Sequence, residues 1–225
     1  MAKKNFQKED EQLENMNEAL TTTGQWIEDH SNMLTWIIAA IAAVVLGIIA
    51  LNNYVIRPKG VEASNEMAKA EAYFQQGDFQ KALMGDDAEC IGFEEIAASY
   101  RLFQQGKLAA LYAGVCHYEM GEFDEAAEYL KRFSAKDDIM DPAAAMLLGD
   151  AFVHMEELNK AVAAFENAGK SGNELIAPIA WKKAGLVYLE LGNKKAAKNA
   201  FVTIRDAYPA SAEARDIDRF VAMAE

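Results

Sequence analysis

An uncharged, strongly apolar run extends from residue 33 to residue 51 and is rich in Ile, Val, Ala and Leu. In an α-helix such a run extends about 28 Å, close to the hydrocarbon thickness of a bilayer. Trp36 and Tyr54 lie near its two ends, as amphipathic rings do at lipid–water interfaces. A buried core helix would have a polar face, which this run lacks. The pattern therefore predicts an uncleaved, single-pass transmembrane helix over residues 33–56.

Polar residues flank this run on both sides. Residues 1–32 predict a polar tail with a short amphipathic helix, which either contacts a partner at the membrane surface or is a solvated tail. Pro58 disfavours a helical conformation for the residue before it. We therefore expect the transmembrane helix to end at this proline and residues 57–62 to form a linker.

Small residues recur at a nearly constant interval in the rest of the chain. Gly114, Gly149 and Gly185 are 35 and 36 residues apart, and each is followed by an alanine twelve residues later. Two helices approach closely only where their side chains are small. A period of this size is typical of stacked helical hairpins, so the sequence predicts an all-α superhelix.

The period also predicts the boundaries of the array. A repeat domain is expected over residues 63–225, with an irregular insert at 85–106 that contains a short helix. Residues 210–224 predict a capping helix that turns Ile217, Phe220 and Val221 toward the array. The hairpins themselves are expected near residues 63–84, 107–133, 142–168 and 178–205.

Composition excludes some partners. The net charge is −13, and residues 61–225 hold 17 Lys and Arg against 28 Asp and Glu. Without a basic stripe, nucleic acid is not an expected partner. Cys90 and Cys116 are too few to hold the fold together, and the sequence leaves open whether they are buried thiols or a disulfide.

No pattern for catalysis or metal binding is found. His30, His117 and His154 are not spaced as metal ligands, and His117 occupies a packing position in its repeat. The glycines occur singly, and paired carboxylates lie at turns or helix starts, where negative charge is ordinary. We expect no catalytic residue, no cofactor and no metal site. An enzyme subunit with a site between hairpins is the alternative of another class.

The expected working surface is a stripe on the first helix of each hairpin, about 100° around the helix from the glycines. Its apolar character suggests that it holds a segment of a partner protein. The alternative is that the last helix or the array itself covers these residues. The stripe consists of Leu111, Val115, Tyr118, Met146, Asp150, Val153, Lys182, Leu186 and Leu189.

The last hairpin resembles the tetratricopeptide repeat, which is a helix–turn–helix of 34 residues. That resemblance implies a superhelix whose concave face is lined by first helices. The matching positions are Trp181, Gly185, Tyr188, Ala197, Phe201 and Pro209.

The order of tail, membrane helix and repeat domain over about residues 10–224 is similar to the YfgM family. The segments 92–96, 108–114 and 208–217 resemble membrane-anchored repeat proteins of Bacteroidetes. The resemblance implies an ancillary subunit of the Sec translocon in the inner membrane that contacts translocon subunits and a periplasmic chaperone or secreted client. It also implies a cytoplasmic N-terminus and a periplasmic repeat domain.

Two alternatives stay open from the residues. Arg57 and Lys59 follow the apolar run directly, and the positive-inside rule would place them in the cytoplasm. The array could also serve as a general cell-envelope scaffold in division, outer-membrane assembly or secretion-machinery assembly, without a translocon role.

Overall fold

The computed structural model describes residues 30–86 and 90–225. Every regular element in these residues is helical, and no strand occurs among them. The chain divides into two compact units, Met1–Pro58 and Lys59–Glu225. Most of the tail predicted over residues 1–32 lies outside the described residues.

The described part of the first unit is helical throughout. Helix α2 covers Ser31–Leu51 and is followed by a π-helical turn, η1, at Asn52–Ile56. The described residues contain one helix that is long and apolar enough to cross a membrane by length and composition, and none of its apolar window is buried.

The expected helix end at Pro58 and the linker at residues 57–62 are wrong. Helix α3 covers Arg57–Gln75 and includes the proline. A proline inside a helix cannot donate a hydrogen bond, and its ring crowds the carbonyl four residues earlier. Here the wider η1 turn comes directly before it, and the Arg57 N–H bonds to the Asn52 carbonyl, five residues back. This wider spacing accommodates the ring within a helical backbone.

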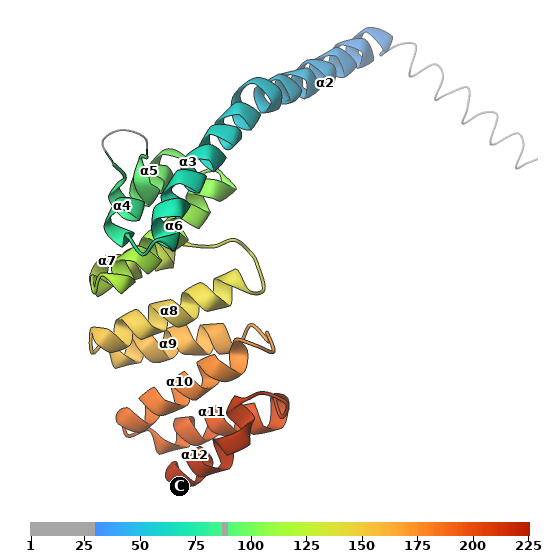
Figure 1. The fold of residues 1–225 in the computed structure, drawn as a ribbon. Coiled ribbons are helices and arrows are strands. Elements are labelled where there is room, and N and C mark those ends of the chain that lie inside the picture. Colours follow the sequence, from blue (N-terminus) through green and yellow to red (C-terminus); the bar gives the residue numbers. More distant parts are fainter. Residues whose placement is uncertain (1–29, 87–89) are drawn as a thin grey trace, which may run out of the picture. The chain divides into compact units, whose positions relative to one another are not determined.

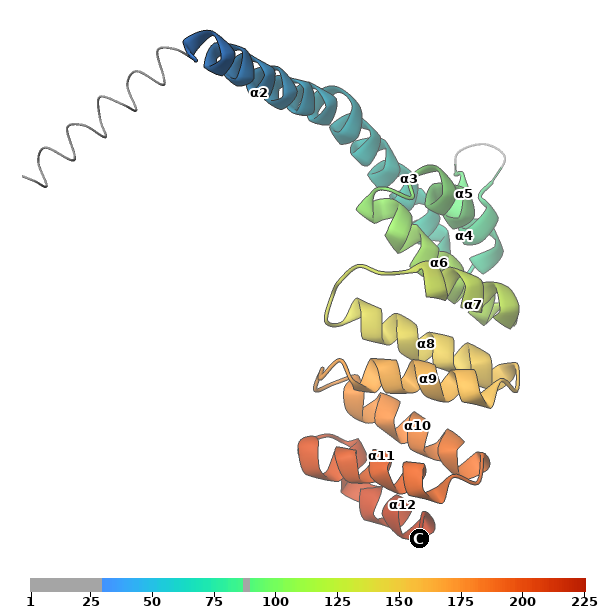
Figure 2. The same cartoon turned by 180° about the vertical axis from the view of Figure 1, so that it is seen from behind.

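The second unit consists of helical hairpins that stack one after another (Figures 1 and 2). Each first helix is antiparallel to the helix that follows it, so the connections between hairpins lie along one edge. After α3 the helices of these pairs are α4 (Phe79–Met84), α6 (Gln104–Glu119), α7 (Phe123–Arg132), α8 (Met140–His154), α9 (Leu158–Gly169), α10 (Ala177–Glu190) and α11 (Lys194–Ala207).

Small residues allow the two helices of a hairpin to cross closely, as predicted. A methyl group on Gly114 would lie 2.8 Å from Leu130 Cγ in the next helix. At Gly149 the corresponding distance to Phe165 Cε1 is 2.5 Å. The first helices α6 and α8 therefore each pack a glycine directly on a large apolar side chain of the next helix.

The tight turn within each hairpin needs a left-handed residue. Gly121 and Gly192 provide it, with φ angles of 80° and 71°. The third hairpin has Glu156 at the equivalent position, with φ 58°. The turn conformation is thus kept even where the residue type is unfavourable for it.

The insert contributes to the core instead of looping over it. It contains α5 (Gly92–Ser99), whose Phe93 and Ile96 are fully buried. They pack in one cluster with Cys90 and Cys116, which are both buried, free thiols. This cluster joins α3, α4, α5 and α6 into one packed end of the array.

The array closes with a short 3₁₀ turn and a helix. Residues Glu213–Asp216 form η2 and Ile217–Met223 form α12. Ile217 and Val221 are buried against α11, and Phe220 packs beside them. The single helix expected over 210–224 begins later than predicted, because the chain turns first, with the Ser211 N–H bonded to the Tyr208 carbonyl at 3.0 Å.

Candidate protein-interaction surface

The nine residues of the first-helix stripe lie on α6, α8 and α10. Eight of them are half-buried, and Leu186 is 43% exposed. The stripe is therefore neither a core seam nor a fully solvated face. Its parts differ in what they contact.

On α6 the stripe packs against neighbouring hairpins. The Tyr118 ring makes edge contacts with Phe123, at 5.4 Å between centroids, and with His154 on α8, at 5.7 Å. Leu111 packs beside the buried Leu130. These residues hold α6 to α7 and α8 while keeping part of their surface exposed.

On α8 the stripe combines apolar and charged side chains. Met146 and Val153 pack on the core cluster around Phe165. Between them, both carboxylate oxygens of Asp150 accept hydrogen bonds from Lys183 Nζ at 2.6 Å. This ion pair ties α8 to α10 in the middle of the stripe.

On α10 the cap covers part of the stripe. Lys182 Nζ lies 3.0 Å from Asp216 Oδ1 and 4.8 Å from the centroid of the Phe220 ring. Leu189 packs on the cluster that contains Ile217. The alternative that the last helix covers these residues is thus correct for Lys182, whereas Leu186 stays exposed.

The buried His117 belongs to a hydrogen-bonding network that sequence reasoning missed. Its ring is 5% exposed, with Nδ1 2.7 Å from Glu122 Oε2 and Nε2 3.1 Å from Glu94 Oε1. The hydroxyl of Tyr129 donates to the same Glu94 oxygen at 3.2 Å, and the Tyr129 ring stacks on the imidazole. Its packing role was predicted, but its partner on α5 is 23 residues away and leaves no local signal.

The equivalent position in the last hairpin uses a different acceptor. The Tyr188 hydroxyl donates to Glu166 Oε1 at 2.7 Å. Burial, and then this bond to a carboxylate, raise the pKa of Tyr188 to about 12. The position three residues after each crossing glycine is therefore a packing and hydrogen-bonding position in both hairpins.

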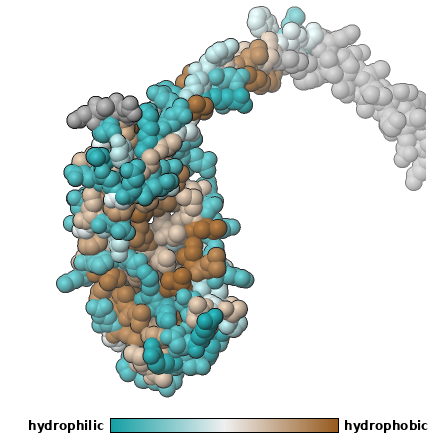
Figure 3. Space-filling model, in the orientation of Figure 1, coloured by the Kyte–Doolittle hydropathy of each residue, from teal (hydrophilic) through white to brown (hydrophobic). Residues whose placement is uncertain are grey.

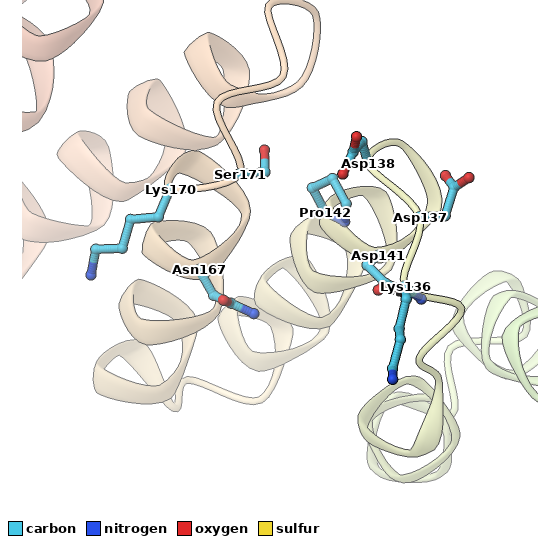
Figure 4. A pocket seen from close by; sticks show the side chains of 8 residues that line it. All are labelled: Lys136, Asp137, Asp138, Asp141, Pro142, Asn167, Lys170 and Ser171. Atoms are coloured by element: carbon cyan, nitrogen blue, oxygen red, sulfur yellow. Dashed lines mark hydrogen bonds between the residues drawn. The ribbon is translucent and has the colours of Figure 1, made fainter. Parts of the chain in front are cut away.

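A cavity of about 430 Å³ opens between the α7–α8 and α9–α10 loops (Figure 4). The labelled side chains point in different directions and not toward one centre. The Asp141 carboxylate accepts the N–H groups of Ala135 and Lys136, at 2.7 and 2.9 Å. Lys170 pairs with Glu166 at 2.8 Å. These charges order the loops, and among the described residues no group of three His, Cys, Asp or Glu could hold a metal ion.

Comparison with known proteins shows what this geometry resembles. Two family models described as tetratricopeptide repeat match residues 113–174 and 182–211. Curated protein sequences give no match.

Solved structures share the fold at low sequence identity. A crystal structure of MamA protein is 20% identical, with a TM-score of 0.53 over 72% of this chain and 89% of that chain. MamA of AMB-1 is 17% identical, with a TM-score of 0.53 over 73% of this chain and 81% of that chain. A Podosopora anserina putative kinesin light chain with nearly identical TPR-like repeats is 13% identical, with a TM-score of 0.52 over 72% of this chain and 85% of that chain. Residues 113–174 and 182–211 are therefore tetratricopeptide repeats within an all-helical array of that type.

Proposed function

We propose that this chain is a membrane-anchored scaffold that binds other proteins through the first-helix stripe. The observation that carries the proposal is that the stripe continues over α6, α8 and α10 with apolar side chains that the array does not fully bury. Leu186, on α10, is the most exposed residue of the stripe, at 43%. Repeat arrays offer extended concave surfaces to partner chains, and partly exposed apolar patches mark such contacts.

The membrane anchor is the helix over residues 33–56. Its support is that α2 is uncharged, long enough to span a bilayer and unburied among the described residues. We place it in the inner membrane, with the N-terminus in the cytoplasm and the repeat domain in the periplasm. The role needs no catalytic residue and no cofactor.

We assign the scaffold to the Sec translocon and the periplasmic chaperone network. This assignment is supported by the similarity of the chain layout to the YfgM family. The expected partners are translocon subunits and a chaperone or secreted client.

Crosslinking of the full chain in intact membranes, followed by mass spectrometry, tests the binding role. Leu186→Glu places a charge in the stripe at an exposed site, so the fold should tolerate it. We expect it to abolish crosslinks to translocon subunits. Leu191→Glu is the matched control, because Leu191 is 37% exposed and lies at the turn after α10, outside the stripe.

The outcomes separate the candidate roles. Unchanged crosslinks with Leu186→Glu would contradict binding through the stripe. Crosslinks only to division or outer-membrane assembly proteins would replace the translocon role by a general envelope scaffold. Tyr118→Glu is a second variant, and because its ring packs on Phe123 and His154 its folding must be checked by circular dichroism.

External protease added to spheroplasts tests the topology. A periplasmic repeat domain is degraded, and a cytoplasmic domain is protected until the membrane is opened. Protection from the protease would assign the repeat domain to the cytoplasm, which is the side that Arg57 and Lys59 suggest.

A further inference from the structure

Two loops between hairpins are built in the same way. Asp137 Oδ1 accepts the N–H groups of Ile139 and Met140, at 2.9 and 2.8 Å. Asn173 Oδ1, one repeat later, accepts the corresponding N–H groups of Leu175 and Ile176, at 2.9 and 3.0 Å. A side-chain oxygen thus caps the turn that leads into the next first helix in both loops.

Each cap holds a large apolar residue in solvent. Ile139 is 59% exposed and Leu175 is 77% exposed, and each lies two residues after its capping side chain. Leu102 lies 37 residues before Ile139, also ahead of a first helix, and is 85% exposed. Single exposed apolar residues are ordinary, but large apolar residues that are exposed at one interval along one edge are not expected by chance.

The loops form one continuous edge. Asn173 Nδ2 donates a hydrogen bond of 3.0 Å to the Asp138 carbonyl, which ties the two loops together. Next to Leu175 a cavity of about 520 Å³ is lined mainly by apolar groups, among them Ile179, Tyr208 and Pro209. Hydrophobic surface is visible on the side of the array where these loops lie (Figure 3).

Acidic groups flank this apolar edge. Glu174 and Glu213 line the cavity, and Asp138 follows the first cap. Within residues 30–86 and 90–225 no ion pair engages any of these three carboxylates. Lys136 in the first loop also has no ion pair among these residues, so the three carboxylates leave the edge with a net negative charge, which favours a cationic partner and disfavours an anionic lipid surface.

We propose that this edge, made by Ile139, Leu175 and the cavity beside Tyr208, binds an extended segment of another protein in which bulky apolar side chains alternate with Lys or Arg. The apolar side chains of the segment contact Ile139 and enter the cavity beside Leu175. Its cationic groups meet Glu174 and Glu213. The edge is a second interaction surface, separate from the first-helix stripe.

The test uses the full chain in phosphatidylcholine nanodiscs, with empty nanodiscs as the blank. The probe is a short fluorescein-labelled peptide that alternates Leu, Lys and Ser, and binding is measured by fluorescence anisotropy. Two matched peptides replace Lys by Glu or Leu by Ser. We expect both replacements to weaken binding about tenfold, because one loses the charge complement and the other the apolar contact.

Variants then locate the site. Leu175→Ser and Ile139→Ser should each weaken binding of the Leu–Lys peptide by about tenfold, and their thermal unfolding should match that of the parent because both side chains are exposed. Glu174→Gln should weaken it by a smaller factor. Leu191→Ser, at the opposite end of the hairpin, should leave binding unchanged.

The stripe provides the decisive comparison. If Leu186→Ser weakened binding of the Leu–Lys peptide and Leu175→Ser did not, the peptide would be assigned to the stripe and the edge proposal would be overturned. Equal binding of the Leu–Glu peptide would overturn it as well. Loss of translocon crosslinks in Leu186→Glu with retained peptide binding would leave both surfaces standing, so the two proposals fail independently.

Discussion

A methyl group on Gly185 would lie 2.3 Å from Cε1 of Phe201, so α10 can cross α11 only because residue 185 has no side chain. Phe201 is fully buried. The same relationship joins Gly149 to Phe165 one hairpin earlier. In these two hairpins, the contact between one glycine and one aromatic ring sets how closely the two helices approach.

Gly185→Ala should destabilise the array by about 1–3 kcal/mol through overpacking, although alanine is the better helix former. Urea unfolding followed by circular dichroism measures the loss. In a Phe201→Leu background the added methyl finds more room, so the cost of Gly185→Ala should be smaller. An equal cost in both backgrounds would show that the ring is not what excludes the methyl group.

Glu156→Gly should stabilise the array by about 1 kcal/mol. Glu156 has φ 58°, a left-handed conformation that strains a residue with a side chain and that glycine adopts freely. Denaturation midpoints measure the gain. Gly192→Ala at the equivalent turn is the matched opposite, since its φ is 71° and no atom lies within 4 Å of the added carbon. It should destabilise, and a gain there would contradict the explanation.

Asp137→Asn should make the array less sensitive to acid. Hydrogen bonds from the backbone N–H groups of Met140 and Ile139 hold the pKa of Asp137 below its usual value. A lowered folded-state pKa stabilises the fold above about pH 4, and this contribution is lost as the pH falls through the folded-state value. An asparagine side chain can accept the same backbone hydrogen bonds, as Asn173 does in the next loop, but it has no group that titrates in this pH range.

Unfolding free energies measured from pH 5 downward check this result. The parent should lose stability more steeply than the variant below about pH 4. Asn173→Asp should add a similar acid-sensitive contribution to the other loop. Parallel curves for all three proteins would refute the role of the Asp137 carboxylate.

Neither cysteine should react with a thiol reagent in the folded chain. Burial raises the pKa of Cys116 to about 12 and also raises the pKa of Cys90, so the reactive thiolate is scarce near neutral pH. Ellman's reagent should detect no thiol at pH 8 in the native state and two after unfolding in urea. Detection of none after unfolding would mean that the two residues form a disulfide, an alternative that the sequence leaves open.

Local patterns predicted much of the fold. The hairpins follow from glycine and alanine spacing, because the helix crossing and the tight turn depend on residues within one repeat. Pro58 misled the prediction, since its effect on a helix depends on the η1 turn before it. The cap begins later than expected because its first residues turn through a bond between Ser211 and Tyr208.

The candidate surface was less predictable, because exposure depends on contacts between repeats. The face of α10 alone does not reveal that Asp216 and Phe220 reach Lys182. Glu94 and His117 are likewise brought together only by the packing of the insert. The repeated caps at Asp137 and Asn173 were not predicted, because one loop uses an aspartate and the other an asparagine, and the exposure of the residues that follow them was not predicted either.

In these two loops, different residues fix the backbone and face solvent. Asp137 and Asn173 fix the backbone with their own side chains, so the array does not depend on the identity of Ile139 or Leu175 two positions later. Substitution at these two positions can accumulate without a penalty in folding. The edge can therefore change what it recognises over evolutionary time, or by design, while the stacked hairpins beneath it stay the same.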